Sequence, residues 1–190
     1  MDARPILAFI AALVASLLTG CAGQGEGTTT TATTDQTRQA EVRTNGAAVM
    51  PFDLDKTKHT FTNTADGGDQ TVTVRDPRDP EQLDLLREHL REIAEEFSAG
   101  NFAAPAAIHG SAMPGLETLQ ARPDSYTITY IEQPDGAKLE YRSTDAEIIA
   151  ALHDWFDAQL TDHGADATSG SMSGMPQELV CAHHPETCTE

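Results

Sequence analysis

Basic residues are scarce in this chain: 12 Lys and Arg stand against 30 Asp and Glu, which gives a formal net charge of -18 at pH 7. A surface this acidic repels phosphate groups, so the composition excludes nucleic acid as a partner and opposes binding to anionic lipid headgroups. Solubility is the simplest use of such a charge, and steering of cations is the alternative.

Familiar hydrolase motifs and membrane-spanning runs are also missing. The chain has no Gly-x-Ser-x-Gly nucleophile elbow, no His-Glu-x-x-His metal motif and no glycine-rich phosphate loop. The apolar run from Ile6 to Leu18 is shorter than the ~20 residues that span a bilayer as a helix. The sequence therefore gives no support for hydrolytic chemistry, and an enzymatic role is less expected than a binding role.

The N-terminus has the features of an export signal: Arg4, then the apolar run, then Leu18-Thr19-Gly20-Cys21. This last stretch resembles the lipobox of bacterial lipoproteins. The resemblance implies that residues 1–20 are a signal peptide, that cleavage occurs before Cys21, and that acyl chains such as palmitate are attached to this cysteine. An ordinary secretory peptide with a chance cysteine is the alternative. The export signal predicts an extracytoplasmic protein, and the lipidated cysteine predicts an anchor in the bacterial cell membrane or outer membrane. Each methylene buried in the membrane stabilises such an anchor by ~0.8 kcal/mol.

Composition divides the remaining chain into three parts. Residues 21–50 are rich in Gly, Thr, Gln and Ala and contain little that could form a core, so they predict a flexible lipidated tether. Residues 51–165 carry the regular apolar patterns of one folded domain. Residues 166–190 lose these patterns again and predict a disordered tail that contains Met, Cys and His.

The apolar patterns predict two successive units of strand, strand and helix. In the first unit, residues 57–64 alternate so that His59 and Phe61 share a face, and a turn leads into a second strand. A helix then begins at Asp79, as N-cap, and ends near Gly100. The expected inward positions of this second strand and helix are Val72, Val74, Leu83, Leu86, Leu90, Ile93 and Phe97.

The second unit repeats this order. Strands are expected at 126–131 and around 139–141, and a helix that starts with the capping box 144–147 ends at Gly164. The apolar stripe of this helix consists of Ile149, Leu152, Phe156 and Leu160, with Ile148 and Trp155 on its flank. We therefore expect an α+β fold, with two ββα units in tandem, an antiparallel sheet and two long helices packed on one face. Chance similarity between two common patterns is the alternative to a true repeat.

Three histidines of the folded part are candidate metal ligands. His59 faces inward from its strand, His109 lies with Met113 in the connection between the units, and His163 lies near the centre of the second apolar stripe. If the three imidazoles converge, they predict a copper or zinc site with Met113 as a soft fourth ligand. The alternative is that each histidine is structural, as His163 would be if it were a cation at a helix C-terminus. Of two further histidines, His89 is expected at the core boundary and His153 on the surface.

The end of the chain offers a second set of possible ligands. Four thiol and imidazole side chains lie close together in sequence there: Cys181, His183, His184 and Cys188. In an oxidising compartment Cys181 and Cys188 are expected to form a disulfide, which leaves His183 and His184 able to bind metal. The alternative is that both thiolates bind a soft metal directly.

Several stretches of the folded part resemble a family of small exported bacterial proteins of unsettled function. They are His59-Thr60-Phe61, Gly67-Gly68, the helix from Asp79 to Phe97, Ile108-His109-Gly110 with Met113-Pro114-Gly115, and residues 152–160 with Asp162-His163-Gly164. The resemblance covers about residues 57–165. Some members carry the label aspartate carbamoyltransferase, but the residues of this acidic chain do not support it, because that activity needs a basic cradle for carbamoyl phosphate.

Together these features predict a membrane-anchored extracytoplasmic lipoprotein that binds or senses a transition metal, with copper or zinc as its cofactor. The alternative is an envelope module that binds another protein and needs no metal. In both cases, contact with the membrane comes through the acyl chains on Cys21.

Overall fold

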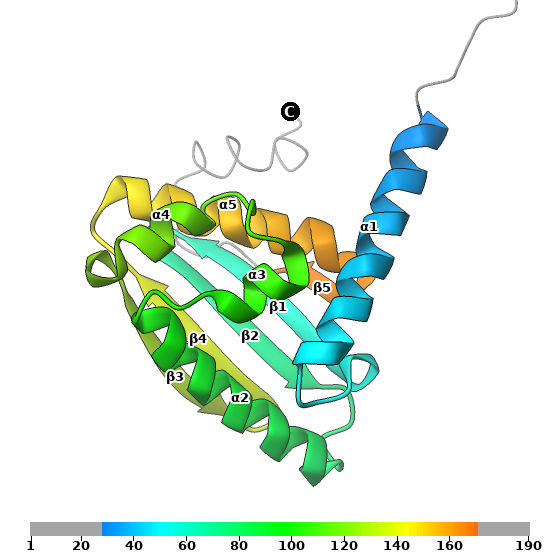
Figure 1. Ribbon diagram of the computed structural model, residues 1–190. Helices are drawn as coiled ribbons and strands as arrows, with labels where there is room; N and C mark the ends of the chain where they lie inside the picture. The colour runs from blue at the N-terminus through cyan, green and yellow to red at the C-terminus, as the bar shows by residue number, and fades with distance from the viewer. Residues whose placement is uncertain (1–27, 171–190) are drawn as a thin grey trace, which may run out of the picture.

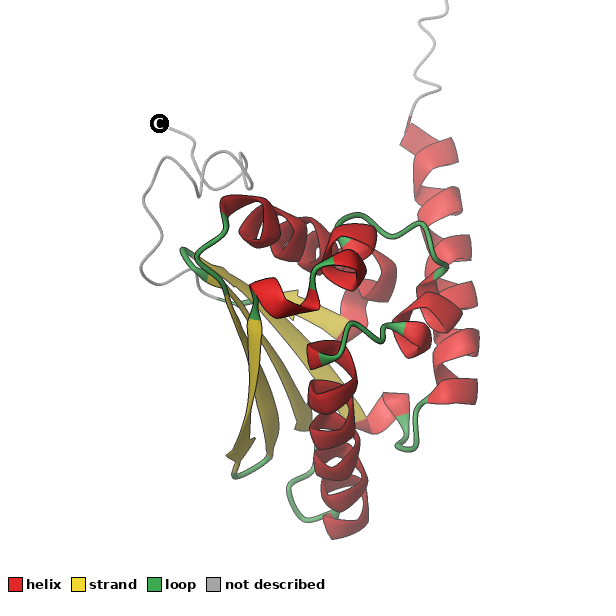
Figure 2. Ribbon diagram, turned by 60° about the vertical axis from the view of Figure 1, so that its left-hand side comes forward, coloured by secondary structure: helices red, strands yellow, loops and turns green. Residues whose placement is uncertain are grey.

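A computed structural model describes residues 28–170, which form an α+β fold with helices on one side of a five-stranded sheet (Figure 1 and Figure 2). The expected fold class is confirmed at this level. In chain order, the helices and strands are α1 (Thr28–Val49), β1 (Thr57–Thr64), β2 (Gly67–Val74), α2 (Pro80–Ser98), α3 (Ala103–His109), α4 (Leu116–Ala121), β3 (Thr127–Gln133), β4 (Gly136–Arg142), α5 (Ala146–His163) and β5 (Ala167–Ser169). Short 3-10 turns lie at Leu54–Lys56, Pro123–Ser125 and Gly164–Asp166.

The sheet contains two hairpins that pair with each other through their second strands. β1 and β2 are joined at Ala65 and Asp66, and β3 and β4 at Pro134 and Asp135. Pro and Asp favour such tight connections because Pro fixes φ and Asp can bond to nearby backbone. β2 and β4 pair antiparallel, which gives the strand order β3-β4-β2-β1-β5. Each hairpin is followed along the chain by one long helix, α2 or α5, but three further helices are present.

The sheet is mixed, which corrects the expectation of a wholly antiparallel sheet. β5 pairs parallel with β1, so that Ala167 lies opposite His59. α5 returns the chain to the end of the sheet where β1 begins, and the residues that follow run in the same direction as β1 (Figure 1). This strand lies in the part of the chain that we expected to be tail. Three residues are too few to give a period-two pattern, which is why the sequence did not predict it.

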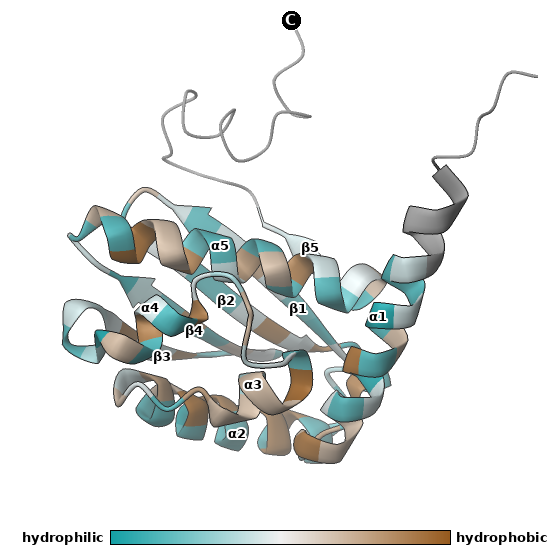
Figure 3. Ribbon diagram, turned by 45° about the horizontal axis from the view of Figure 1, so that its top comes forward, coloured by the Kyte–Doolittle hydropathy of each residue, from teal (hydrophilic) through white to brown (hydrophobic). Residues whose placement is uncertain are grey.

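The core lies between the sheet and the helices α2 and α5. Asp79 caps α2 as expected, whereas α5 is capped by Asp145, one residue after the expected start at Thr144. Figure 3 shows hydrophobic and hydrophilic residues alternating around both helices, as amphipathic helices on a sheet require. Burying each large apolar side chain contributes roughly 1.5–3 kcal/mol relative to exposure. The largest fully buried side chains include Trp155, Tyr141, Phe61, Phe102 and Phe156.

The buried face of α5 is wider than its apolar stripe, and this corrects the expected surface position of His153. This side chain is only 2% exposed, and its Nε2 lies 3.0 Å from the carbonyl oxygen of Thr64 and 2.9 Å from that of Gly67. Ile148 and Trp155 are also buried, whereas Ile149 is only half-buried. The turn between β1 and β2 covers this flank of α5 and takes up the polar imidazole through backbone acceptors.

Residues 28–49 form helix α1, where we expected a flexible tether. The helix packs against α3 and α5, and Val42 and Gly46 are buried. Its composition gives little intrinsic helical stability, so tertiary contacts stabilise it. The apolar stripe that packs is too sparse to be visible in the sequence. Within residues 28–170, no helix is both long and apolar enough to cross a bilayer.

Candidate functional site

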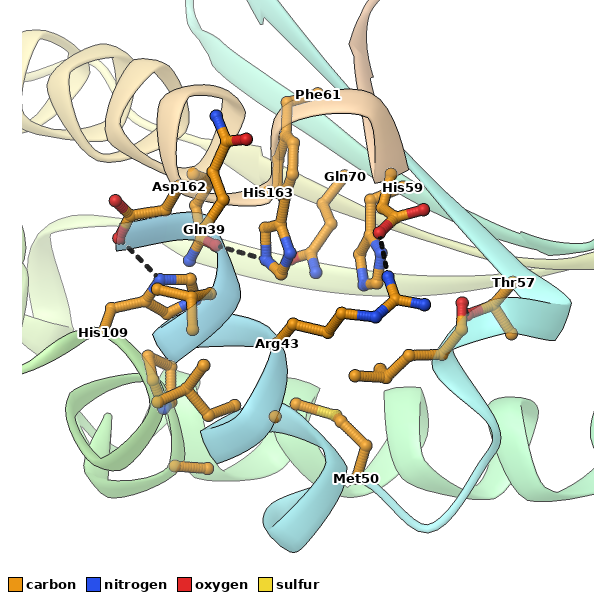
Figure 4. Close-up of a pocket in the computed structure, with 18 of the residues that line it drawn as sticks. Gln39, Arg43, Met50, Thr57, His59, Phe61, Gln70, His109, Asp162 and His163 are labelled. Carbon is orange, nitrogen blue, oxygen red and sulfur yellow. Dashed lines mark hydrogen bonds and ion pairs between the residues drawn. The ribbon is translucent and has the colours of Figure 1, made fainter. Parts of the chain in front are cut away.

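A cavity of about 270 Å³ lies between α1, α2, α3, α5 and the sheet (Figure 4). Most of its wall is apolar, and imidazole rings contribute much of the polar part. The apolar lining includes Val42, Met50, Leu54, Phe61, Ile93, Phe97, Ile108 and Trp155. Because α1 contributes to the wall, this helix helps to enclose the cavity.

The three candidate histidines of the folded part all line this cavity. His59 comes from β1, His109 from the end of α3 and His163 from the last turn of α5. The rings of His59 and His163 are stacked with centroids 5.1 Å apart and an interplanar angle of 9°. The ring of His109 meets that of His163 edge to face, with centroids 5.0 Å apart. The structure therefore brings together three imidazoles that are far apart in the sequence.

Met113 does not accompany the three imidazoles. It is buried, but it borders a separate depression that His109 also borders, and it is not among the residues that line the cavity. The other predicted site residues, Cys21, Cys181, His183, His184 and Cys188, lie outside the described residues.

His109 is held by an ion-paired carboxylate. Its Nδ1 lies 2.8 Å from Oδ2 of Asp162, and Arg38 donates to both carboxylate oxygens at 2.9 and 2.6 Å. Arg38 also donates to the carbonyl oxygen of His109, 2.6 Å away, so it connects α1, α3 and α5. Since the carboxylate accepts, Nδ1 of the imidazole carries the proton and Nε2 keeps its lone pair.

Burial and hydrogen bonding together decide which of Arg38, Asp162 and His109 are charged. Burial opposes ionisation of Asp162, but hydrogen bonds from Arg38 and His109 outweigh it and keep the pKa of Asp162 below its usual value. Burial also lowers the pKa of His109, although the hydrogen bond to Asp162 acts in the opposite direction. The group therefore consists of a charged pair, Arg38 and Asp162, that orients a neutral imidazole.

His59 and His163 are also neutral at physiological pH. Burial, with the nearby imidazoles as a smaller cause, lowers the pKa of His59 from 6.5 to about 3 and that of His163 to about 4. Nε2 of His163 lies 3.1 Å from Oε1 of Gln159, which accepts its proton. Among the described residues, the ring of His59 has ring contacts but no hydrogen bond. Neutral imidazole is the form that binds metal ions and accepts hydrogen bonds.

The imidazoles are close together but do not form a finished metal centre. Among residues 28–170, no three His, Cys, Asp or Glu side chains are placed to hold one metal ion. Imidazole lone pairs lie in the ring plane, and the nearly parallel planes of His59 and His163 do not meet at a common point. One of these rings would have to turn before both could bind the same ion.

Sequence reasoning missed three side chains that shape the site. His89 lines the cavity and packs edge to face on Phe52, although we expected it only at the core boundary. Asp162 could have been found, because it follows Trp155 by seven positions and so lies on the buried face of the helix. No sequence pattern identified Arg38 as a site residue, because the residues around it have the composition of a tether.

Comparison with known proteins adds nothing to the geometry of this site. The chain matches no protein-family model, no curated protein and no solved structure.

Proposed function

We propose that this chain is an extracytoplasmic lipoprotein, anchored through Cys21, that binds a transition-metal ion with the imidazoles of the cavity. The observation that carries the proposal is the meeting of His59, His109 and His163, all neutral, in one cavity. Copper and zinc are the ions that suit such ligands. The lipobox-like stretch supports the anchoring, and the acidic surface agrees with attraction of cations.

His109 has the features of a preorganised ligand. Metal-binding histidines commonly donate their second ring proton to a carboxylate, which fixes the tautomer and the ring orientation. Asp162 provides this carboxylate, and Arg38 fixes the carboxylate in turn. This chain of contacts from Arg38 to Asp162 to His109 leaves Nε2 of His109 as the nitrogen that can bind a metal ion.

The other two imidazoles can complete the site with one side-chain rotation. The bond from Nε2 of His163 to Gln159 leaves the lone pair on Nδ1. His59 has no hydrogen bond to lose among the described residues, so turning its ring costs its stacking contacts with Phe61 and His163. Each such contact contributes about 0.5–1.5 kcal/mol, and the two together are small beside the free energy of metal coordination.

The test is calorimetric titration of Cu(II), Zn(II) and Ni(II) into residues 22–190, which include every described element. Stoichiometric binding should be lost or weakened at least ~100-fold in His109→Gln and His163→Gln. The matched control is His89→Gln, which removes an imidazole of the same cavity that packs on Phe52. A second protein, stopped at Gly170 so that β5 is kept, places the site within the described fold if it binds equally well.

Three results would contradict the proposal. The first is the absence of binding at micromolar metal concentrations, and the second is binding that survives both substitutions. Binding that disappears only when residues 171–190 are removed would also contradict it, because the ligands would then be in the tail.

The open face of the sheet favours a second candidate function, interaction with another envelope protein. The helices lie on the opposite side (Figure 2), and this face carries polar side chains such as Thr60, Thr71 and Lys138 at paired positions. Crosslinking in the cell envelope with the Thr71→Arg variant as control separates the candidates, since that substitution should abolish a protein contact without affecting metal binding.

A further inference from the structure

The cavity is much larger than a metal ion and its imidazole ligands require. Metal–nitrogen bonds are about 2.0–2.1 Å long, so an ion held by the histidines occupies only one part of the space. An apolar cavity of ~150 Å³ is already large enough to bind benzene, and this cavity measures about 270 Å³. The unfilled part could hold an organic molecule of about the size of a substituted benzene ring.

The walls of this space are suited to an aromatic ring. Phe61, Phe97 and Trp155 contribute aromatic side chains, and Met50 lies across from His163 in Figure 4. Aromatic rings and the methionine sulfur make favourable contacts with a bound ring, in addition to the removal of apolar surface from water. The apolar lining therefore favours a ligand that is mainly apolar.

The charges around the cavity exclude an ionic ligand. Asp162 is paired with Arg38, and Arg43 is paired with Asp55 and Asp166. Every charged side chain that lines the cavity thus has a partner among the described residues. A charged ligand would lose much of its hydration and gain no counter-charge, which is costly in a mainly apolar space.

The imidazoles nevertheless offer polar contacts, and His59 is suited to one of them. His59 lines the cavity, is neutral, and has no hydrogen bond among the described residues. A neutral imidazole can accept a hydrogen bond from a hydroxyl group. His59 is thus a lining imidazole with no hydrogen bond to break among the described residues, beside a space of mostly apolar and aromatic walls.

From the size, lining and charge of the cavity, we infer that it binds a small neutral monocyclic phenol, with the ring among the aromatic side chains and the hydroxyl donating to His59. This goes beyond the proposed metal binding and does not depend on it.

The test uses p-cresol and toluene as probes, with residues 22–190 kept in a chelator so that no metal takes part. Trp155 is the chain's single tryptophan and lines the cavity, so its fluorescence reports occupancy, and calorimetry measures affinity. We expect saturable one-to-one binding of p-cresol. In His59→Phe, which keeps a ring but removes the nitrogen atoms, p-cresol should bind about tenfold more weakly, whereas toluene should not.

Ala104→Phe fills part of the cavity from α3 and should abolish binding of both probes. Circular dichroism and thermal unfolding check that this variant folds, and His59→Phe alone still tests the inference if it does not. No saturable binding of p-cresol to the parent protein would overturn the inference, as would equal weakening of both probes in His59→Phe. Because the chelator is present throughout, a failure of metal binding would leave these results unchanged.

Discussion

Mild acid should destabilise this protein through His59 and His163. The pKa values of these imidazoles are lowered in the folded state from 6.5 to about 3 and about 4. Between those values and 6.5, the unfolded chain binds protons that the folded chain does not. Stability is therefore highest above pH 6.5 and is lost as the pH falls below it, because protons then favour the unfolded state.

The loss of folding stability at about pH 5 is set mainly by the pKa of the imidazoles in the unfolded chain. There, the unfolded imidazole is about 1.5 pH units below its pKa, and each unit corresponds to about 1.36 kcal/mol. Each histidine thus costs ~2 kcal/mol, and the two together ~4 kcal/mol, relative to about pH 7.5. Both folded pKa values lie below 5, so the folded imidazoles are mainly neutral at that pH. Burial lowers the pKa of His89 and His109 as well, which adds in the same direction.

Urea unfolding of residues 22–190 at the two pH values measures the loss directly. Asp162 contributes little to this loss, because hydrogen bonds from Arg38 and His109 keep its pKa below its usual value and the carboxylate stays ionised at about pH 5. His59→Gln and His163→Gln should each remove ~2 kcal/mol of the pH dependence, whatever they do to stability itself. The reasoning is refuted if the parent protein loses less than ~1 kcal/mol, or if the double variant keeps the full pH dependence.

Three further substitutions test particular contacts. In Gly115→Ala a Cβ would lie 1.9 Å from the carbonyl oxygen of Ala151, whereas in Gly110→Ala it meets nothing within 4 Å, although both glycines have positive φ. Thermal unfolding should therefore show a loss of ~3 kcal/mol or more for the first and ~1 kcal/mol for the second, and equal losses would contradict the close packing of α4 on α5. Arg38→Ala should cost ~1–2 kcal/mol in urea unfolding and increase amide exchange in α1; because this side chain is 36% exposed, solvent screening limits the effect. His153→Leu should cost ~1–3 kcal/mol by removing the hydrogen bonding of a buried Nε2 to two backbone carbonyls, and an unchanged midpoint of unfolding would show that these bonds do not matter.

The parts of the fold that the sequence predicted correctly are those with a strong local signal. Alternation in β1 placed His59 and Phe61 on the inward face, and the stripe and cap of α2 located its start at Asp79. The position of His163 at the inward end of α5 follows from the same periodicity. Each of these features depends on residues within a few turns or one strand, where the geometry of helix or strand decides which side chains share a face.

The misplaced residues are those whose environment comes from distant parts of the chain. His153 is buried because the turn between β1 and β2 covers it, and β5 exists because β1 offers an unpaired edge. α1 is helical because α3 and α5 bury Val42 and pair with Arg38. None of these partners is near in sequence, so no local pattern marks them.

By itself, the sequence determined the α+β class, the two hairpins, the two long helices and the inward direction of His59 and His163. Only the tertiary structure decided that these imidazoles meet His109, that Met113 lies elsewhere, and that Asp162 and Arg38 hold His109 in place. The physical reason is that the periodicity of a helix or strand fixes the direction of a side chain within its own element. Which side chains come together depends on how elements distant in sequence pack, and that is decided by the burial of the whole apolar surface at once.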